Sequence, residues 1–183
     1  MFISHEDKSM ERRGFVKNMA LLGGVGAAAA ALMSPAIATP VENVLAEEAA
    51  IRETLRKYCF LLDDNRPDEF VQLFTEQAVF YAADLRYEGR AAIKKELAEK
   101  PREPGKHLAF PALIELQSGT EALAWSDFLR VKVKPGDPSA WLITNIGRYH
   151  DRLVKVGPRW LFAERGVYIL GMANPSKYTV PPA

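Results

Sequence analysis

The sequence contains little of what defines several common classes of protein. Among 183 residues there are one cysteine, Cys59, and three histidines, so neither an intramolecular disulfide nor a zinc site built from Cys and His is expected. Lysine and arginine total 24 against 23 aspartates and glutamates, a formal net charge of +1. Because binding to a phosphate backbone depends on clustered positive charge, no nucleic-acid partner is expected.

The first 38 residues have the pattern of an export signal. The pair Arg12-Arg13 precedes a weakly apolar run over residues 19–33, and Ala36-Ile37-Ala38 follows that run. A basic start, a short apolar stretch and an Ala-x-Ala exit are typical of a signal peptide, and the paired arginines resemble the twin-arginine type. The run is shorter than the ~20 residues that span a bilayer. We therefore predict a signal peptide over 1–38, a periplasmic location without a stable membrane anchor after cleavage, and one domain over 39–183.

Helical spacing dominates the first half of that domain. Apolar residues recur every three or four positions from Glu42 to Leu62, with charged residues between them, which predicts an amphipathic helix. Pro67 favours the start of a second, short helix through residue 73, because proline fits a first helical turn. A strand is predicted over 78–82 and a third helix over 89–97.

The second half of the domain has the spacing of strands. Segments 107–117, 121–134, 140–156 and 159–170 are each long enough for a strand and are separated by turn residues rich in Gly, Pro, Ser and Asp. Such short connections predict an antiparallel meander. Helices followed by a long antiparallel sheet indicate an α+β fold, in which the sheet curves round the helices to bury its inner face.

Several segments together carry a resemblance to a known family. They are Ile51-Arg52-Glu53 to Tyr58, Leu62-Asp63, Phe70 to Phe80, Glu88 to Ile93, and the closing Gly157-Pro158-Arg159-Trp160 with Glu164-Arg165. The chain resembles the SnoaL-like branch of the nuclear transport factor 2 (NTF2) superfamily over nearly all of residues 42–170. The resemblance implies a cone-shaped α+β barrel that encloses one pocket. It leaves the chemistry open, because one fold hosts many functions.

Two members of that superfamily, scytalone dehydratase and hexachlorocyclohexane dehydrochlorinase, imply candidate catalytic residues. Both place an aspartate at the end of the first long helix and a histidine at the start of a later strand, positions that Asp63 and His107 hold here. The dehydrochlorinase uses an arginine five residues after a tryptophan to assist the leaving group, as Arg165 follows Trp160. Tyr58 stands where that enzyme has a lysine and offers a hydroxyl to polarise an oxygen.

The residues also suggest this chemistry without the family. A histidine that donates one ring N–H to a carboxylate is fixed in tautomer, and its other nitrogen is a stronger base because the carboxylate stabilises the imidazolium. Such a pair removes a proton from carbon or water without any metal or organic cofactor. A purely structural interpretation stays open: Asp63 could cap the turn that follows it, His107 could be a hydrogen-bonded strand residue, and Arg165 could pair with a carboxylate on the sheet.

Further candidates for substrate binding lie on the predicted strands. Asp127 could be a pocket carboxylate or the cross-strand partner of an arginine. Trp125 and Tyr149 belong to a set of aromatic residues that either fill the core or give the pocket an aromatic wall for a ring-shaped substrate.

These observations predict a cofactor-independent lyase or isomerase that acts on a small, apolar, cyclic molecule through Asp63 and His107. The alternative is a periplasmic protein that binds a small hydrophobic ligand without reacting. The resemblance also implies a homodimer or homotrimer formed through the outer face of the sheet.

Overall fold

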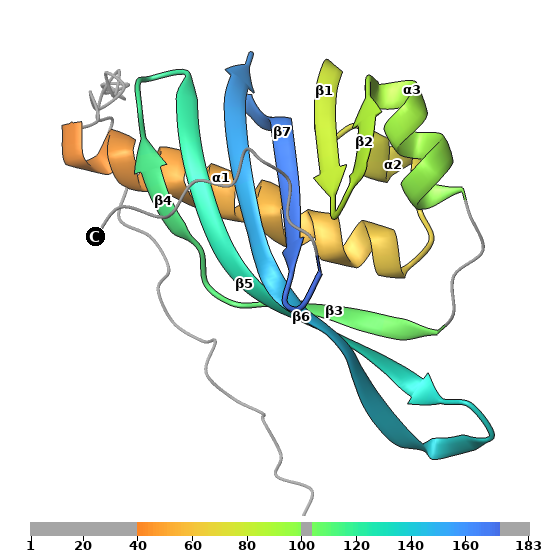
Figure 1. Cartoon of the computed structure of the whole chain (residues 1–183). Coiled ribbons are helices and arrows are strands. Elements are labelled where there is room, and N and C mark those ends of the chain that lie inside the picture. The colour runs from red at the N-terminus through yellow and green to blue at the C-terminus, as the bar shows by residue number, and fades with distance from the viewer. Residues whose placement is uncertain (1–39, 100–103, 173–183) are drawn as a thin grey trace, which may run out of the picture. The chain divides into compact units, whose positions relative to one another are not determined.

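The computed structural model describes residues 40–99 and 104–172, shown in colour in Figure 1. The predicted signal peptide over 1–38 lies outside these residues. The helical elements are α1 (Pro40–Asp63), α2 (Pro67–Val71), α3 (Arg90–Ile93) and the π-helical turn η1 (Lys94–Ala98). The strands are β1 (Phe74–Ala82), β2 (Leu85–Glu88), β3 (Gly105–Ala109), β4 (Leu113–Leu116), β5 (Glu121–Lys134), β6 (Asp137–Val156) and β7 (Arg159–Ile169).

Helix α1 confirms the amphipathic pattern and ends on Asp63. Its inward face buries Ile51, Leu55 and Leu62, and its outward face carries charged pairs at helical spacing, such as Lys57 with Glu53. Among residues 40–99 and 104–172, no helix has the length and hydropathy needed to cross a bilayer.

The strands form a single curved sheet that does not close on itself, and the helices pack on it as the α+β prediction states. The strand order is β2-β1-β7-β6-β5-β3, with β4 also paired to β5, and α1 runs across one face of the sheet (Figure 1). The strands from β3 to β7 pair antiparallel as predicted, whereas β1, which lies outside the predicted meander, pairs with β7 in parallel. Two such strands need no tight turn between them, so no local sequence signal marks their pairing.

The predicted single strand over 107–117 is also wrong. It is divided into β3 and β4, with Phe110, Pro111 and Ala112 between them. Phe110 still donates its backbone N–H to the carbonyl oxygen of Asp127 at 2.9 Å, but Pro111 has no N–H to continue the ladder. The chain therefore bends between β3 and β4, and residues 108–112 form part of a pocket wall.

Smaller departures concern the region before β3. The predicted strand over 78–82 is longer and begins at Phe74, and the pattern gave no indication of β2. The helix predicted over 89–97 begins as α3 and continues as η1, whose wider turns end at Ala98. These elements pack on the outer end of the sheet beside β1 (Figure 1).

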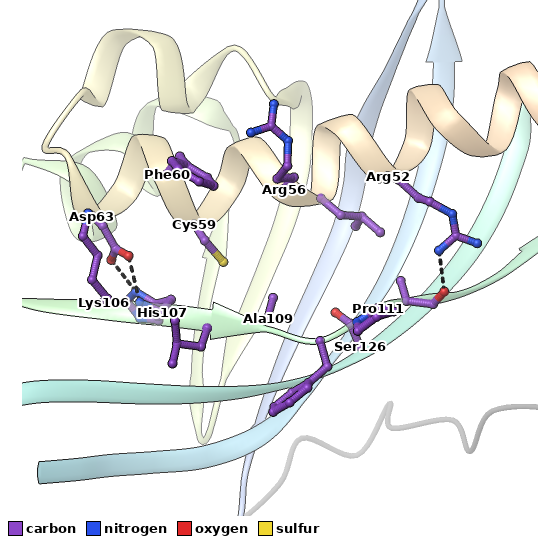
Figure 2. A pocket seen from close by; sticks show the side chains of 14 residues that line it. Arg52, Arg56, Cys59, Phe60, Asp63, Lys106, His107, Ala109, Pro111 and Ser126 are labelled. Atoms are coloured by element: carbon purple, nitrogen blue, oxygen red, sulfur yellow. Dashed lines mark hydrogen bonds and ion pairs between the residues drawn. The ribbon is translucent and has the colours of Figure 1, made fainter. Parts of the chain in front are cut away.

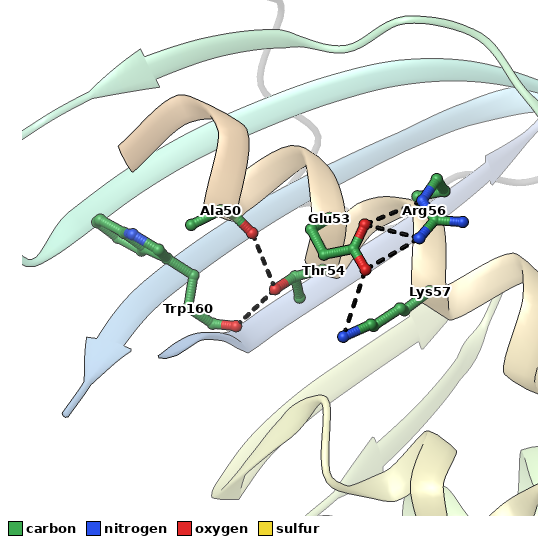
Figure 3. Close-up of polar contacts among 6 residues, drawn as sticks. All are labelled: Ala50, Glu53, Thr54, Arg56, Lys57 and Trp160. Carbon is green, nitrogen blue, oxygen red and sulfur yellow. Dashed lines mark hydrogen bonds and ion pairs between the residues drawn. The ribbon is translucent and has the colours of Figure 1, made fainter. Parts of the chain in front are cut away.

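A buried hydroxyl fastens α1 to the sheet. Thr54 lies on the inward face of α1 and donates to the carbonyl oxygen of Trp160 in β7 at 2.8 Å (Figure 3). The Trp160 indole N–H donates in turn to Glu47 at 2.7 Å. Two residues of α1, about two turns apart, are thus joined to the same residue of the last strand, and this fixes the middle of α1 over the sheet.

Candidate active site

A pocket of about 550 Å³ lies between α1 and the strands β3 and β5 (Figure 2). Its walls are largely apolar: Leu55 and Phe60 come from α1, and residues 108–112 come from β3 and the segment that follows it. A pocket of this size and character suits a small organic molecule. Asp63 and His107 both line it.

Asp63 and His107 meet through two hydrogen bonds. The Nδ1 atom of His107 lies 2.6 Å from Oδ1 of Asp63, and the backbone N–H of His107 donates to Oδ2 at 2.8 Å. The side chains of His107 and Asp63 are 10% and 6% exposed. Because the carboxylate fixes the proton on Nδ1, the neutral ring keeps its lone pair on Nε2, which is the arrangement of a general base.

The local sequence explains why these two residues meet. Asp63 is the last residue of α1 and follows an apolar turn of that helix. The next residue, Asp64, accepts a hydrogen bond from Nζ of Lys106 at 2.9 Å. The last residue of α1 and the residue that follows it therefore contact two successive residues of β3. The hydrogen bond with Asp64 raises the pKa of Lys106, and this exposed pair helps to hold β3 in register with the helix end.

Arg165 does not line this pocket. It is 1% exposed, and its guanidinium carbon lies 3.7 Å from the ring centre of Tyr58 and 3.9 Å from that of Tyr149. Its Nε is 3.5 Å from Oδ1 of the fully buried Asp151. The structure thus places Arg165 beside a carboxylate of the sheet, which was the alternative to a catalytic role.

The buried pair is poorly satisfied. Within the described part of the chain, both carboxylate oxygens of Asp151 and the Nε and Nη1 atoms of Arg165 form no hydrogen bond. Burial raises the pKa of Asp151 to about 7, although the charge of Arg165 acts in the opposite direction.

Burial likewise raises the pKa of the Cys59 thiol to about 11, so this pocket-lining sulfur stays protonated at neutral pH.

Tyr58 and Tyr149 belong to the same interior cluster as Arg165. Their ring centres are 5.7 Å apart, and Tyr149 also stacks on Phe128 at 4.3 Å. Burial raises the pKa of Tyr149 well above its ordinary value. The structure brings neither tyrosine among the residues that line the pocket.

Trp125 and Asp127 lie on the other face of the sheet. Both flank Ser126, which lines the pocket, and neighbouring residues of a strand point to opposite faces. Trp125 stacks on His150 with ring centres 5.2 Å apart. Asp127 accepts a hydrogen bond from Nε of Arg148 at 2.6 Å, and this lowers its pKa. Asp127 is therefore the cross-strand partner of an arginine and not a carboxylate of the pocket.

The pocket also contains residues that the sequence analysis did not single out. On α1 these are Arg52, Arg56, Cys59 and Phe60, which lead down the helix to Asp63. Arg52, Arg56 and Phe60 follow one another at intervals of four residues, and Cys59 comes four residues before Asp63. This spacing was a usable signal, because side chains at that spacing share a helix face. Ser126 gave no such signal, since its position depends on how β5 pairs with β3.

Among the described residues, no three His, Cys, Asp or Glu side chains are grouped so that they could hold a metal ion.

The helices, the curved open sheet and the pocket beneath α1 define an α+β protein of the NTF2-like class. The model of the SnoaL-like domain family matches residues 43–166, and the chain belongs to that family. No curated protein matches the sequence.

Solved structures are similar over most of the domain. A protein of unknown function from Mycobacterium tuberculosis is 24% identical, with a TM-score of 0.66 over 72% of this chain and 76% of its own. A protein assigned as a scytalone dehydratase from Novosphingobium aromaticivorans is 26% identical, with a TM-score of 0.62 over 76% and 99%. A hexachlorocyclohexane dehydrochlorinase from Novosphingobium barchaimii is 14% identical, with a TM-score of 0.60 over 76% and 98%.

Proposed function

We propose that this protein is a cofactor-independent lyase or isomerase that uses His107 as a general base, assisted by Asp63, on a small, apolar, cyclic substrate. The observation that carries the proposal is the contact of 2.6 Å between Nδ1 of His107 and Oδ1 of Asp63 at the wall of a largely apolar pocket. Membership of a family whose structural relatives include proteins named for dehydration and dehydrochlorination supports this class of reaction.

The proposed reaction begins with removal of a proton from a carbon of the substrate by Nε2 of His107. The imidazolium that forms donates Nδ1–H to the Asp63 carboxylate, whose negative charge stabilises it. In an elimination, the electron pair of the broken C–H bond forms a double bond as the leaving group departs. In an isomerisation, the same proton returns to a different carbon of the substrate.

Hydrogen exchange tests proton removal without knowledge of the product. The purified domain is incubated in D₂O with a panel of cyclic ketones and cyclic alcohols, and deuterium uptake at carbon is followed by mass spectrometry and NMR. We expect the wild-type protein to accelerate uptake by at least one compound, and His107→Gln to lower that rate by about 10²-fold or more, the usual contribution of a general base.

The chain offers matched controls for both residues. His150→Gln changes the other described histidine, which lies on the opposite face of the sheet beside Trp125, and Asp64→Asn changes the neighbour of Asp63. Both control proteins should keep the wild-type rate. Equal rates in wild type, His107→Gln and Asp63→Asn, with all proteins folded by circular dichroism, contradict the proposal.

A second candidate, ligand binding without reaction, is favoured by the state of the charged residues at the pocket. Arg52 donates to the carbonyl oxygen of Ala112 at 2.8 Å, and Arg56 donates to Glu53 at 2.7 Å. Both guanidinium groups are thus hydrogen-bonded within the chain, and the rest of the cavity wall is mainly apolar. Tight binding of a panel compound with no exchange at any carbon would favour this candidate over catalysis.

We further propose that the protein acts in the periplasm after removal of residues 1–38 and that it assembles with a second or third copy. Exposed apolar side chains on β6 support assembly, because Trp141, Ile143 and Ile146 are 59%, 60% and 49% exposed. The mass of the protein recovered from a periplasmic fraction tests cleavage, and sedimentation of wild type against Ile143→Asp tests assembly.

A further inference from the structure

The polar groups that line the pocket are nearly all committed to partners within the chain. Arg52, Arg56 and Lys106 donate to Ala112, Glu53 and Asp64, respectively, and the Asp63 carboxylate accepts from His107. His107 keeps Nε2 for the proposed proton transfer. A substrate that enters this space therefore meets few groups able to fix its orientation.

Ser126 is the exception. It lies on β5, on the side of the pocket opposite α1 (Figure 2), and is 6% exposed. Across the sheet it pairs with Tyr149, and two residues further along β5 Phe128 pairs with Ala109 of β3, which also lines the pocket. Within residues 40–99 and 104–172, its hydroxyl forms no hydrogen bond, whereas buried polar groups in proteins normally have a partner.

We propose that Ser126 is a positioning residue for the substrate and that the substrate class is an apolar ring bearing a carbonyl or hydroxyl oxygen. This inference rests on the proposed function. It narrows the substrate class to oxygenated cyclic compounds and excludes hydrocarbons and halogenated hydrocarbons. A ligand oxygen supplies the partner that the Ser126 hydroxyl lacks. With the apolar body against residues 108–112, this hydrogen bond holds one face of the ring toward Nε2 of His107.

The physical basis is the difference between two ligands of equal shape. An oxygenated ligand exchanges its hydrogen bond with water for one with Ser126, whereas a hydrocarbon leaves the hydroxyl unpaired in an apolar wall. A polar group built into a site penalises the analogue that cannot pair with it. Removal of the hydroxyl should therefore weaken the oxygenated ligand only.

The test measures binding of 1-indanone and of indane, its hydrocarbon counterpart, by ligand-observed NMR titration. We expect Ser126→Ala to lower the affinity ratio of the ketone to the hydrocarbon by about threefold to tenfold, the range for one neutral hydrogen bond. The affinity for indane should stay within about twofold, since no hydrogen bond to it is lost.

Companion variants keep the result interpretable. Ser126→Thr retains a hydroxyl and should restore the ratio, and Ser126→Cys gives a second removal if the alanine protein does not fold. Ser139→Ala removes an exposed hydroxyl at the start of β6. That hydroxyl donates to Asp137 at 2.7 Å in the wild-type protein, and the variant should behave as wild type.

The outcomes separate this inference from the proposed catalysis, because binding is measured without turnover. An unchanged ratio in Ser126→Ala and Ser126→Cys overturns the role of Ser126, even if His107 proves essential for exchange. A ratio that depends on Ser126 in a protein without any exchange supports the inference and contradicts the general base. If neither probe binds the wild-type protein, the inference is overturned as well.

Discussion

Asp63 and Asp151 are both held beside a basic side chain, in opposite surroundings. Asp63 accepts hydrogen bonds from the ring and the backbone N–H of His107 at the wall of a pocket. Asp151 faces Arg165 at 3.5 Å in the interior, and its oxygens accept no hydrogen bond within the described part of the chain. The first pair can change charge while its polar atoms stay satisfied. The second pair leaves buried polar atoms without hydrogen bonds, so replacement of one of its two residues should change the free energy of unfolding of the whole domain.

The largest expected effect comes from leaving Asp151 without its cation. Arg165→Met keeps an unbranched apolar side chain between Tyr58 and Tyr149 but leaves the buried carboxylate unpaired. The free energy of unfolding should fall by about 3–5 kcal/mol, the usual result of breaking a buried ion pair from one side. Urea denaturation measures it, with Arg148→Met on the exposed Asp127 pair as the control. A loss equal to that of the control would mean that the buried pair carries no special weight.

The double variant Arg165→Met with Asp151→Leu sharpens this result. Replacement of both charges by apolar groups removes the desolvation penalty together with the attraction, and such replacements are often neutral or stabilising. We expect the double variant to recover most of the stability that the single variant loses. A simple sum of the two single losses would show that the charges do not interact.

The next effect is a loss of stability as the pH rises from 3.8 to about 7, which the interior pair should cause. Burial raises the pKa of Asp151 from the ordinary 3.8 to about 7, so between these values the folded protein binds a proton that the unfolded chain releases. This contribution to stability is therefore present at low pH and lost as the pH rises to about 7. Relative to Asp151→Asn, wild type should lose about 2–4 kcal/mol over that range. Parallel curves of unfolding free energy against pH for the two proteins would contradict this origin.

A smaller effect on stability is expected at the pocket. Asp63→Asn can still accept the backbone N–H of His107 through its amide oxygen, but it loses the hydrogen bond between Nδ1 of the ring and a carboxylate. Its free energy of unfolding should fall by only about 1 kcal/mol, while the rate of hydrogen exchange at carbon falls by about 10²-fold. Both quantities are measured on the same preparation. A large loss of stability with normal exchange would reverse the roles assigned to the two aspartates.

The smallest effect should come from Asp127, the third aspartate with a basic partner. Its side chain is 54% exposed, and Arg148 lowers its pKa through a hydrogen bond. This contribution is present above the ordinary pKa and disappears as the pH falls through the lowered value, opposite in sign to that of Asp151. Because the pair is exposed, Asp127→Asn should cost less than about 1 kcal/mol at pH 7, as measured by thermal unfolding. A larger loss would indicate a contact beyond the pair with Arg148.

Much of the fold was predictable because its signals are local. The length of α1 follows from the spacing of residues such as Ile51 and Leu55, and the turns at residues 135–136 and 157–158 mark the ends of β5, β6 and β7. The parallel pairing of β1 with β7 was not predictable, because it joins residues far apart in the chain, such as Val79 and Glu164. The break at Pro111 had a signal in the proline itself, which the assignment of one strand over 107–117 passed over.

The candidate site divides in the same way. The family resemblance placed Asp63 and His107 at equivalent positions, and the structure brings them together. The direction of the other candidates depends on register and curvature: Trp125 and Asp127 point away because Ser126 between them points inward. Arg165 lies on a predicted strand, yet whether its guanidinium reaches the pocket or the core is decided by Tyr58 and Tyr149, which come from two other elements.

The position of β7 in the sheet has a consequence for the order in which the domain assembles. β7 is the last described strand along the chain, yet it lies between β1 and β6, and the Phe162 N–H donates to the Leu73 carbonyl oxygen at 2.8 Å. During synthesis, β5 and β6 can pair as soon as they emerge, whereas β1 and β2 must wait for β7 before they join the rest of the sheet. Contacts between distant segments slow folding, so the hairpin of β1 and β2 stays unpaired with the rest of the sheet, and open to chaperones and proteases, until β7 has been made.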